Sequence, residues 1–150
     1  IVVNANDDVE IFGNEIADNA TANFIISSVY STGYKDSSMA KDFDPYPERI
    51  HVHGNKVSGG GDSPDGMDLK GLKVALYGLS GSLPDVLWDG YYNKDRKIDG
   101  KPAGGPQICL RDVNGVVNAD GLGGYKNPSK DARPFECELP RLPAVDLGRD

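Results

Sequence analysis

The chain has 150 residues and a formal net charge of −7. This length suits a single domain. The acidic balance argues against sequence-independent nucleic-acid binding, which needs basic residues to displace counterions, and no apolar run approaches the roughly 20 residues that cross a bilayer. Hydrophobic residues make up 38% of the chain, too many for a disordered protein, so we expect a folded domain.

The first 30 residues contain the clearest pattern in the chain. A short apolar strand at 1–3 recurs at 24–26, and the alternating apolar residues of 9–16, with a central Gly-Asn pair, recur at 50–57. A weaker copy spans 108–118. Alternate side chains of a strand face one side, and Gly and Asn tolerate sharp turns. The alternation predicts an apolar interior made of Val9, Ile11, Ile16, Ile50, Val52 and Val57.

Short strands that repeat every twenty-odd residues, with Gly-Asn corners, are typical of a solenoid. One turn of a solenoid cannot bury its own apolar face, so neighbouring turns stack. We therefore predict an all-β solenoid in one domain, residues 1–150, with turns at about 1–28, 49–59 and 108–118. The alternative is an ordinary antiparallel sandwich in which Gly-Asn forms hairpin turns.

Residues 2–28 resemble the right-handed parallel β-helix repeat. Pectate-lyase-like enzymes, periplasmic copper-related β-helix proteins and many uncharacterised exported bacterial proteins share this repeat. The resemblance covers residues 1–28 and 49–59, roughly a quarter of the chain. More loosely, residues 135–140 resemble the C-terminal part of a family of bacterial parallel β-helix repeat proteins encoded beside a haem-binding partner. The resemblance implies a right-handed parallel β-helix and export from the cell.

Two long insertions interrupt the predicted turns, at about 29–48 and 60–106. The second contains an apolar segment, 72–77, which we interpret as a strand, and no stretch shows sustained helical periodicity. From about residue 122 the chain is rich in Gly, Pro and charged residues. We expect this tail, residues 122–150, to extend across the end of the solenoid, with anchors at Phe135, Leu139 and Leu142.

The chain begins directly in an apolar strand, and a strand edge without a partner favours aggregation. We therefore expect this sequence to be the C-terminal portion of a longer chain. Cys109 and Cys137 fit neither a metal-binding nor a redox motif. Their presence favours a disulfide over two unpaired thiols, and a disulfide implies a secreted or periplasmic protein.

His51 and His53 lie two residues apart on a predicted strand, so both imidazoles are expected on the same outward face. Glu10 occupies the matching position in the earlier copy of the repeat. A His-x-His pair beside a carboxylate can ligate a metal or act as a catalytic acid and base. The simpler interpretation is two solvated residues on an exposed strand.

Three further groups of residues suggest ligands. Asp62, Asp65 and Asp68 surround a glycine and suggest Ca²⁺, the one cofactor that the sequence indicates, although a solvated turn is the simpler explanation. A weaker oxygen-rich loop runs through 112–120. Aromatic residues of the insertions can stack on sugar rings or can pack the insertions onto the rest of the domain. The aromatic candidates are Tyr34, Trp88, Tyr91 and Tyr92.

These features predict an exported module that binds a polysaccharide or a partner protein without catalysis. One alternative is part of a polysaccharide lyase or epimerase with His51 and His53 at its site. Another is a structural end-piece whose partner is the N-terminal remainder of a larger β-helix. Neither a nucleophile-elbow motif nor a phosphate-binding glycine loop occurs in the sequence.

Overall fold

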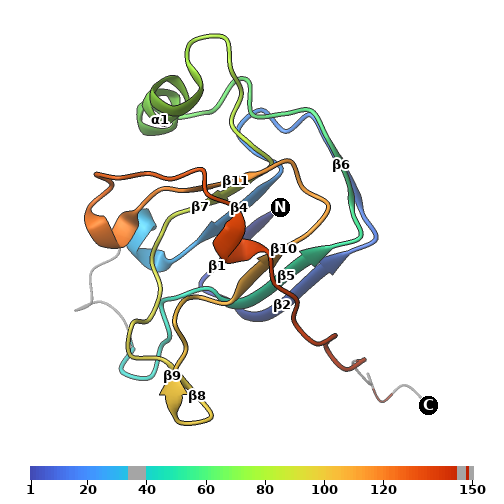
Figure 1. Ribbon diagram of the computed structural model, residues 1–150, viewed down its shortest axis with the longest axis vertical. Helices are drawn as coiled ribbons and strands as arrows, with labels where there is room; N and C mark the ends of the chain where they lie inside the picture. The colour runs from blue at the N-terminus through green and yellow to red at the C-terminus, as the bar shows by residue number, and fades with distance from the viewer. Residues whose placement is uncertain (34–39, 145–147, 149–150) are drawn as a thin grey trace.

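The structure, a computed structural model, describes residues 1–33, 40–144 and 148. Its strands lie in four small sheets (Figure 1). All strands of the two larger sheets run parallel to their neighbours. The four-stranded sheet has the order β1 (Val2–Asn4), β4 (Phe24–Ser27), β7 (Val86–Trp88) and β11 (Val116–Asn118).

The second parallel sheet has three strands, with β5 (Glu48–His53) between β10 (Ile108–Leu110) and β2 (Asp7–Phe12). The other strands form two pairs, and one α-helix and three short 3₁₀ helices complete the described part of the chain. These remaining elements are the parallel pair β3 (Glu15–Ala17) and β6 (Lys56–Ser58), the antiparallel pair β8 (Lys97–Ile98) and β9 (Lys101–Pro102), α1 (Met67–Tyr77), η1 (Val29–Thr32), η3 (Gly121–Gly123) and η4 (Arg133–Phe135).

The strand pairings predicted from the repeat are confirmed. Val2 pairs with Ile25, and Val9 pairs with Ile50. The Gly-Asn corners also match, because Gly13 and Gly54 both have a positive φ, at 69° and 59°, where the chain turns out of β2 and β5. Glycine adopts this left-handed conformation without the steric cost that a side chain brings.

The predicted fold class, a right-handed parallel β-helix, is wrong. The strands fall into small separate sheets, parallel and antiparallel, and the described residues show no solenoid repeat. A solenoid needs a roughly constant length of chain between stacked strands, whereas here the intervals are very unequal: Phe24 pairs with Val86, which pairs in turn with Val116. The predicted insertion at 60–106 supplies β7, which lies between two strands of the four-stranded sheet.

The segment 72–77, predicted to be a strand, is the second half of α1. Leu69, Leu72 and Leu76 recur at the spacing of one helix face. They pack against Leu87 and Val117 on the outer side of the four-stranded sheet. These leucines are partly buried by the sheet, and this tertiary contact favours a helix over a strand.

The main core is formed jointly by the four-stranded and three-stranded sheets. Phe135 of the tail is buried in it, as predicted, whereas Leu139 is half-buried and Leu142 is 41% exposed. No helix in the described ranges is long and apolar enough to cross a membrane. The buried core side chains are Val3, Ile11, Ile16, Phe24, Ile26, Ile50, Val52, Val86, Trp88, Ile108, Leu110, Val116 and Phe135.

Candidate functional site

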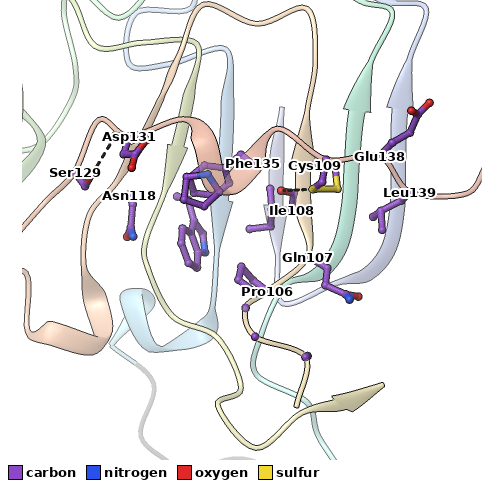
Figure 2. Close-up of a pocket in the computed structure, with 16 residues that line it drawn as sticks. Pro106, Gln107, Ile108, Cys109, Asn118, Ser129, Asp131, Phe135, Glu138 and Leu139 are labelled. Atoms are coloured by element: carbon purple, nitrogen blue, oxygen red, sulfur yellow. Dashed lines mark hydrogen bonds between the residues drawn. A yellow bond between two sulfur atoms is a disulfide. The ribbon is translucent and has the colours of Figure 1, made fainter. Parts of the chain in front are cut away.

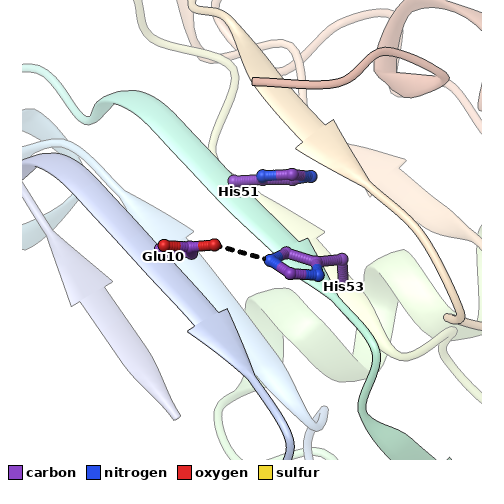
Figure 3. A group of neighbouring side chains, drawn as sticks. All are labelled: Glu10, His51 and His53. Carbon is purple, nitrogen blue, oxygen red and sulfur yellow. Dashed lines mark hydrogen bonds and ion pairs between the residues drawn. The ribbon is translucent and has the colours of Figure 1, made fainter. Parts of the chain in front are cut away.

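The two histidines and Glu10 meet on the outer face of the three-stranded sheet. Ile50 and Val52 are fully buried in the core, so His51 and His53, which alternate with them, face the other way. The parallel register places Glu10 of β2 directly beside His51 of β5. Figure 3 shows the three side chains close together on these two neighbouring strands. We call them the Glu–His–His cluster.

The cluster is compact. His53 Nε2 lies 2.8 Å from Glu10 Oε1, and the rings of His51 and His53 have their centroids 4.2 Å apart. The ring of His53 also stacks on Phe12, with a centroid distance of 5.5 Å and an interplanar angle of 10°. One potential ligand atom from each member of the cluster lies within 4.8 Å of the other two.

His51 is the unusual member of the cluster. It is 5% exposed, and both of its ring nitrogens are buried without a hydrogen-bond partner. A neutral imidazole carries one N–H donor and one acceptor nitrogen, and buried polar groups in folded proteins nearly always find partners. The interpretation of His51 and His53 as two solvated residues is therefore wrong for His51.

The tail covers the cluster. The backbone N–H of Leu142 donates a hydrogen bond of 3.1 Å to Glu10 Oε2, and the guanidinium of Arg141 lies 3.8 Å from Glu10 Oε1 and 5.0 Å from the centre of the Phe12 ring. An open depression of about 710 Å³ remains between the tail and the sheet. Its lining includes His51, His53, Arg111, Glu138 and Arg141.

The predicted disulfide holds the tail in this position. Cys109 and Cys137 are bonded, with their Cα atoms 4.9 Å apart, which confirms the pairing. Cys109 lies on β10 beside His51 of β5. The tail is thus covalently attached at one side of the three-stranded sheet and hydrogen-bonded to Glu10 at the other.

Charge and burial act on the ionisation of the cluster in opposite directions. The hydrogen bond from His53 lowers the pKa of Glu10, and burial offsets part of this effect. Burial, with the nearby His53 as a smaller cause, lowers the pKa of His51, against the attraction of Glu10. At neutral pH these shifts favour an ionised Glu10 and a neutral His51, the forms in which both residues bind metal ions.

A second acidic group, Asp7, Asp44 and Glu48, lies at the start of β2 and β5. Arg96 and Arg49 supply its positive charge. Glu48 Oε2 lies 2.6 Å from Arg96 Nη1, so the two side chains form an ion pair. The N–H groups of Arg96 do not point at this oxygen, so the contact is not a hydrogen bond. These arginines compensate part of the negative charge, and Asp7 Oδ1 stays buried without a hydrogen-bond partner.

The structure does not support the predicted calcium loop. Asp62, Asp65 and Asp68 are exposed, and they are not among the groups whose carboxylate oxygens converge in the described residues. Asp65 accepts a hydrogen bond from Gly66 N–H, and Asp68 lies in the first turn of α1. In the weaker loop, Asp112 accepts a bond from the N–H of Gly54. These carboxylates stabilise turns and a helix start.

The aromatic candidates separate into different environments. Trp88 is 4% exposed, and Tyr92 packs against the core beside it. Trp88 is therefore buried, whereas Tyr92 is half-buried. Tyr91 contacts the rings of Tyr30 and Tyr125 at centroid distances of 5.4 and 6.1 Å. Tyr34 lies outside the described residues.

Two contributors to the site escaped sequence analysis: Arg141 and the backbone N–H of Leu142. Glu10 and Leu142 are 132 residues apart, and no local pattern in a chain predicts such a contact. Comparison of the chain with protein-family models, with curated proteins and with solved structures finds no match.

Proposed function

We propose that this protein binds a divalent transition-metal ion, of which zinc is the best candidate, through Glu10, His51 and His53. The observation that carries the proposal is His51, whose two ring nitrogens are buried without partners beside another imidazole and a carboxylate. A metal bound to one of these nitrogens would compensate much of the cost of burying them.

The donor set selects the class of metal. Two imidazoles and one carboxylate are the ligands of many zinc sites that keep an open coordination position, whereas Ca²⁺ and Mg²⁺ prefer oxygen ligands only. Metal binding would replace the direct contact between His53 and Glu10. The nearby depression, lined by Arg111 and Arg141, leaves room for water or an anion at the remaining position.

Two alternatives explain less. A purely structural ion pair accounts for Glu10 and His53 but leaves the nitrogens of His51 without partners. A lyase or epimerase site would need a polysaccharide to reach His51, which is only 5% exposed. A metal ion needs far less space than a sugar chain does.

The disulfide suits an oxidising compartment, where such bonds form and persist. We therefore propose that the metal-binding protein is secreted or periplasmic. In such a compartment the Cys109–Cys137 bond keeps the tail attached beside the cluster.

The test is a calorimetric titration of chelator-treated protein with Zn²⁺. We expect one ion per chain. His51→Ala should lower the affinity by more than about 100-fold, because even residues that only orient metal ligands are worth about 10–100-fold. Glu10→Gln, which preserves size, should also weaken binding strongly and guards against a folding defect in the histidine variant.

Glu15→Gln is the matched control, because Glu15 is an exposed carboxylate on neighbouring β3. It should leave zinc affinity unchanged, and circular dichroism should show that all variants fold. Zinc binding that is absent from the native protein, or that survives in the His51→Ala and Glu10→Gln variants, would disprove the proposal.

A further inference from the structure

A second cavity, separate from the Glu–His–His cluster, lies between the tail and the segment that leads into β10. Figure 2 shows its walls, formed by the segment that leads into β10 and by the tail around η4. Its volume is about 450 Å³, within the range of about 300–1,000 Å³ that is typical of small-ligand sites. It is therefore large enough for a ring-sized molecule.

One wall of the cavity is apolar and firmly held. Phe135 and Ile108 are 4% and 1% exposed, and the ring of Phe135 meets Trp88 edge-on at 5.6 Å. The bond between Cys109 and Cys137 fixes the tail on the side of β10. This wall offers apolar contact to a ligand and changes shape little, which favours binding.

Trp88 also lacks a hydrogen-bond acceptor. Its indole Nε1–H is buried and has no partner, although Trp88 lines the cavity. The indole nitrogen can only donate, and a buried donor that makes no bond is costly. An oxygen atom of a ligand in the cavity would satisfy it.

Asn118 supplies a second donor. It pairs with Trp88 in register, and in the same row of the four-stranded sheet Ile26 and Val3 face the core. Asn118 thus places an amide at the cavity where this row is otherwise apolar or aromatic. Its Oδ1 accepts a bond from Asp120 N–H at 2.9 Å, and its Nδ2 has no acceptor among the described residues.

Charge at the cavity argues for a neutral ligand. The two carboxylates in its lining, Asp131 and Glu138, are each paired with an arginine: Asp131 with Arg133 at 2.6 Å and Glu138 with Arg111 at 3.5 Å. No Arg or Lys is among the described residues that line the cavity, so an anion would find no cation in the lining to pair with. A cationic ligand would find both carboxylates already engaged.

We propose that this cavity binds a neutral sugar ring, a pyranose residue of a saccharide. A pyranose has apolar C–H faces that suit Phe135 and Ile108, and its ring and hydroxyl oxygens can accept from Trp88 Nε1–H and Asn118 Nδ2. The proposal is independent of metal binding, because it uses no member of the Glu–His–His cluster.

The native protein carries its own probe, because Trp88 is the single tryptophan of the chain. We would titrate it with D-glucose, D-galactose and D-mannose, and with D-glucuronate as the anionic counterpart, and follow tryptophan fluorescence. At least one neutral hexose should give a saturable change, whereas glucuronate should bind more weakly than the hexose of the same ring stereochemistry.

Two variants locate the site. Trp88→Phe keeps an aromatic ring but removes the donor, and Asn118→Ala removes the amide. Each should weaken binding by up to about tenfold, the value of one hydrogen bond. Affinity of the Trp88→Phe variant is measured by saturation-transfer NMR because the fluorophore is lost. Tyr91→Phe, outside the cavity lining, is the control that should bind as the native protein does.

The outcomes are distinct. No response to any hexose, a response to glucuronate alone, or native affinity in both the Trp88→Phe and the Asn118→Ala variant would each overturn the proposal. Because His51→Ala should bind the hexose normally, a failure of zinc binding and a failure of saccharide binding can be told apart.

Discussion

Asn55 is a buried polar residue whose four hydrogen bonds join the two Gly-Asn corners. Its Oδ1 accepts from the backbone and side-chain N–H groups of Asn14, both at 3.0 Å. Its Nδ2 donates to the carbonyls of Ile11, at 2.9 Å, and of His53, at 3.1 Å. These bonds fix the register between β2 and β5, and this register places Glu10 beside the histidines.

Replacement of Asn55 by alanine should therefore be costly. We expect Asn55→Ala to lower the free energy of unfolding by about 1–3 kcal/mol, because buried backbone groups lose their partners. Urea denaturation followed by circular dichroism measures the change. Asn127→Ala, at an exposed side chain without a hydrogen bond, should change stability little. Equal effects of the two substitutions would show that Asn55 does not fix the corner.

At the scale of elements, α1 is a surface helix that is partly buried along one side only. Its leucines face the four-stranded sheet, and Gly71 lies in its middle on the exposed side. A β-carbon at Gly71 would meet nothing within 4 Å. The helix therefore carries a glycine that its packing does not require.

We expect Gly71→Ala to stabilise the protein by about 0.5–1 kcal/mol, since glycine in a helix interior costs this much relative to alanine. Thermal or urea unfolding measures the gain. Gly81→Ala is the contrasting variant: its β-carbon would overlap the carbonyl oxygen of Tyr77, so it should destabilise. A loss of stability in Gly71→Ala would contradict the packing described for α1.

Local patterns in the chain predict the strand pairings, whereas contacts between distant segments leave no such pattern. The pairing of Val9 with Ile50 followed from alternation and from the Gly-Asn corners, which are visible in both segments. The helix was missed because the short run 72–77 contains consecutive apolar residues, which suit a strand or a helix. The entry of β7 into the four-stranded sheet depends on contacts with distant segments, and no local pattern encodes them.

The Glu–His–His cluster was foreseen only in part. Strand periodicity and the repeat placed His51, His53 and Glu10 on one face, and the structure brings them together. The burial of His51 was not predictable from strand alternation, which placed it on an outward face, and neither was the contact of the tail with Glu10 from the other end of the chain. Burial is also what turns the cluster into a candidate metal site.

At the scale of the whole molecule, the tail lies over both candidate sites. Its residues around η4 close the cavity beside Trp88, and Arg141 and Leu142 lie over the Glu–His–His cluster. Phe135 is anchored in the core. Beyond it the noncovalent contacts are weak, since the pair of Arg111 and Glu138 has side chains that are 57% and 69% exposed.

The disulfide should therefore be the main restraint on residues 138–142. We expect the double variant Cys109→Ala, Cys137→Ala to lose about 2–4 kcal/mol of unfolding free energy, as is typical when a loop of this size loses its closure. The amide of Leu142, which donates to Glu10, should exchange its hydrogen faster than in the oxidised protein. Urea denaturation and NMR hydrogen exchange measure the two effects separately.

The two measurements discriminate between roles of the disulfide. Lower stability together with faster Leu142 exchange means that the bond both stabilises the fold and keeps the tail over the cluster. Lower stability with unchanged Leu142 exchange under native conditions would contradict the second role, because Arg141 and the Leu142 amide would then suffice to hold the tail on Glu10. The tail would in that case stay on Glu10 with or without the Cys109–Cys137 bond, and access to the metal site would not depend on the disulfide.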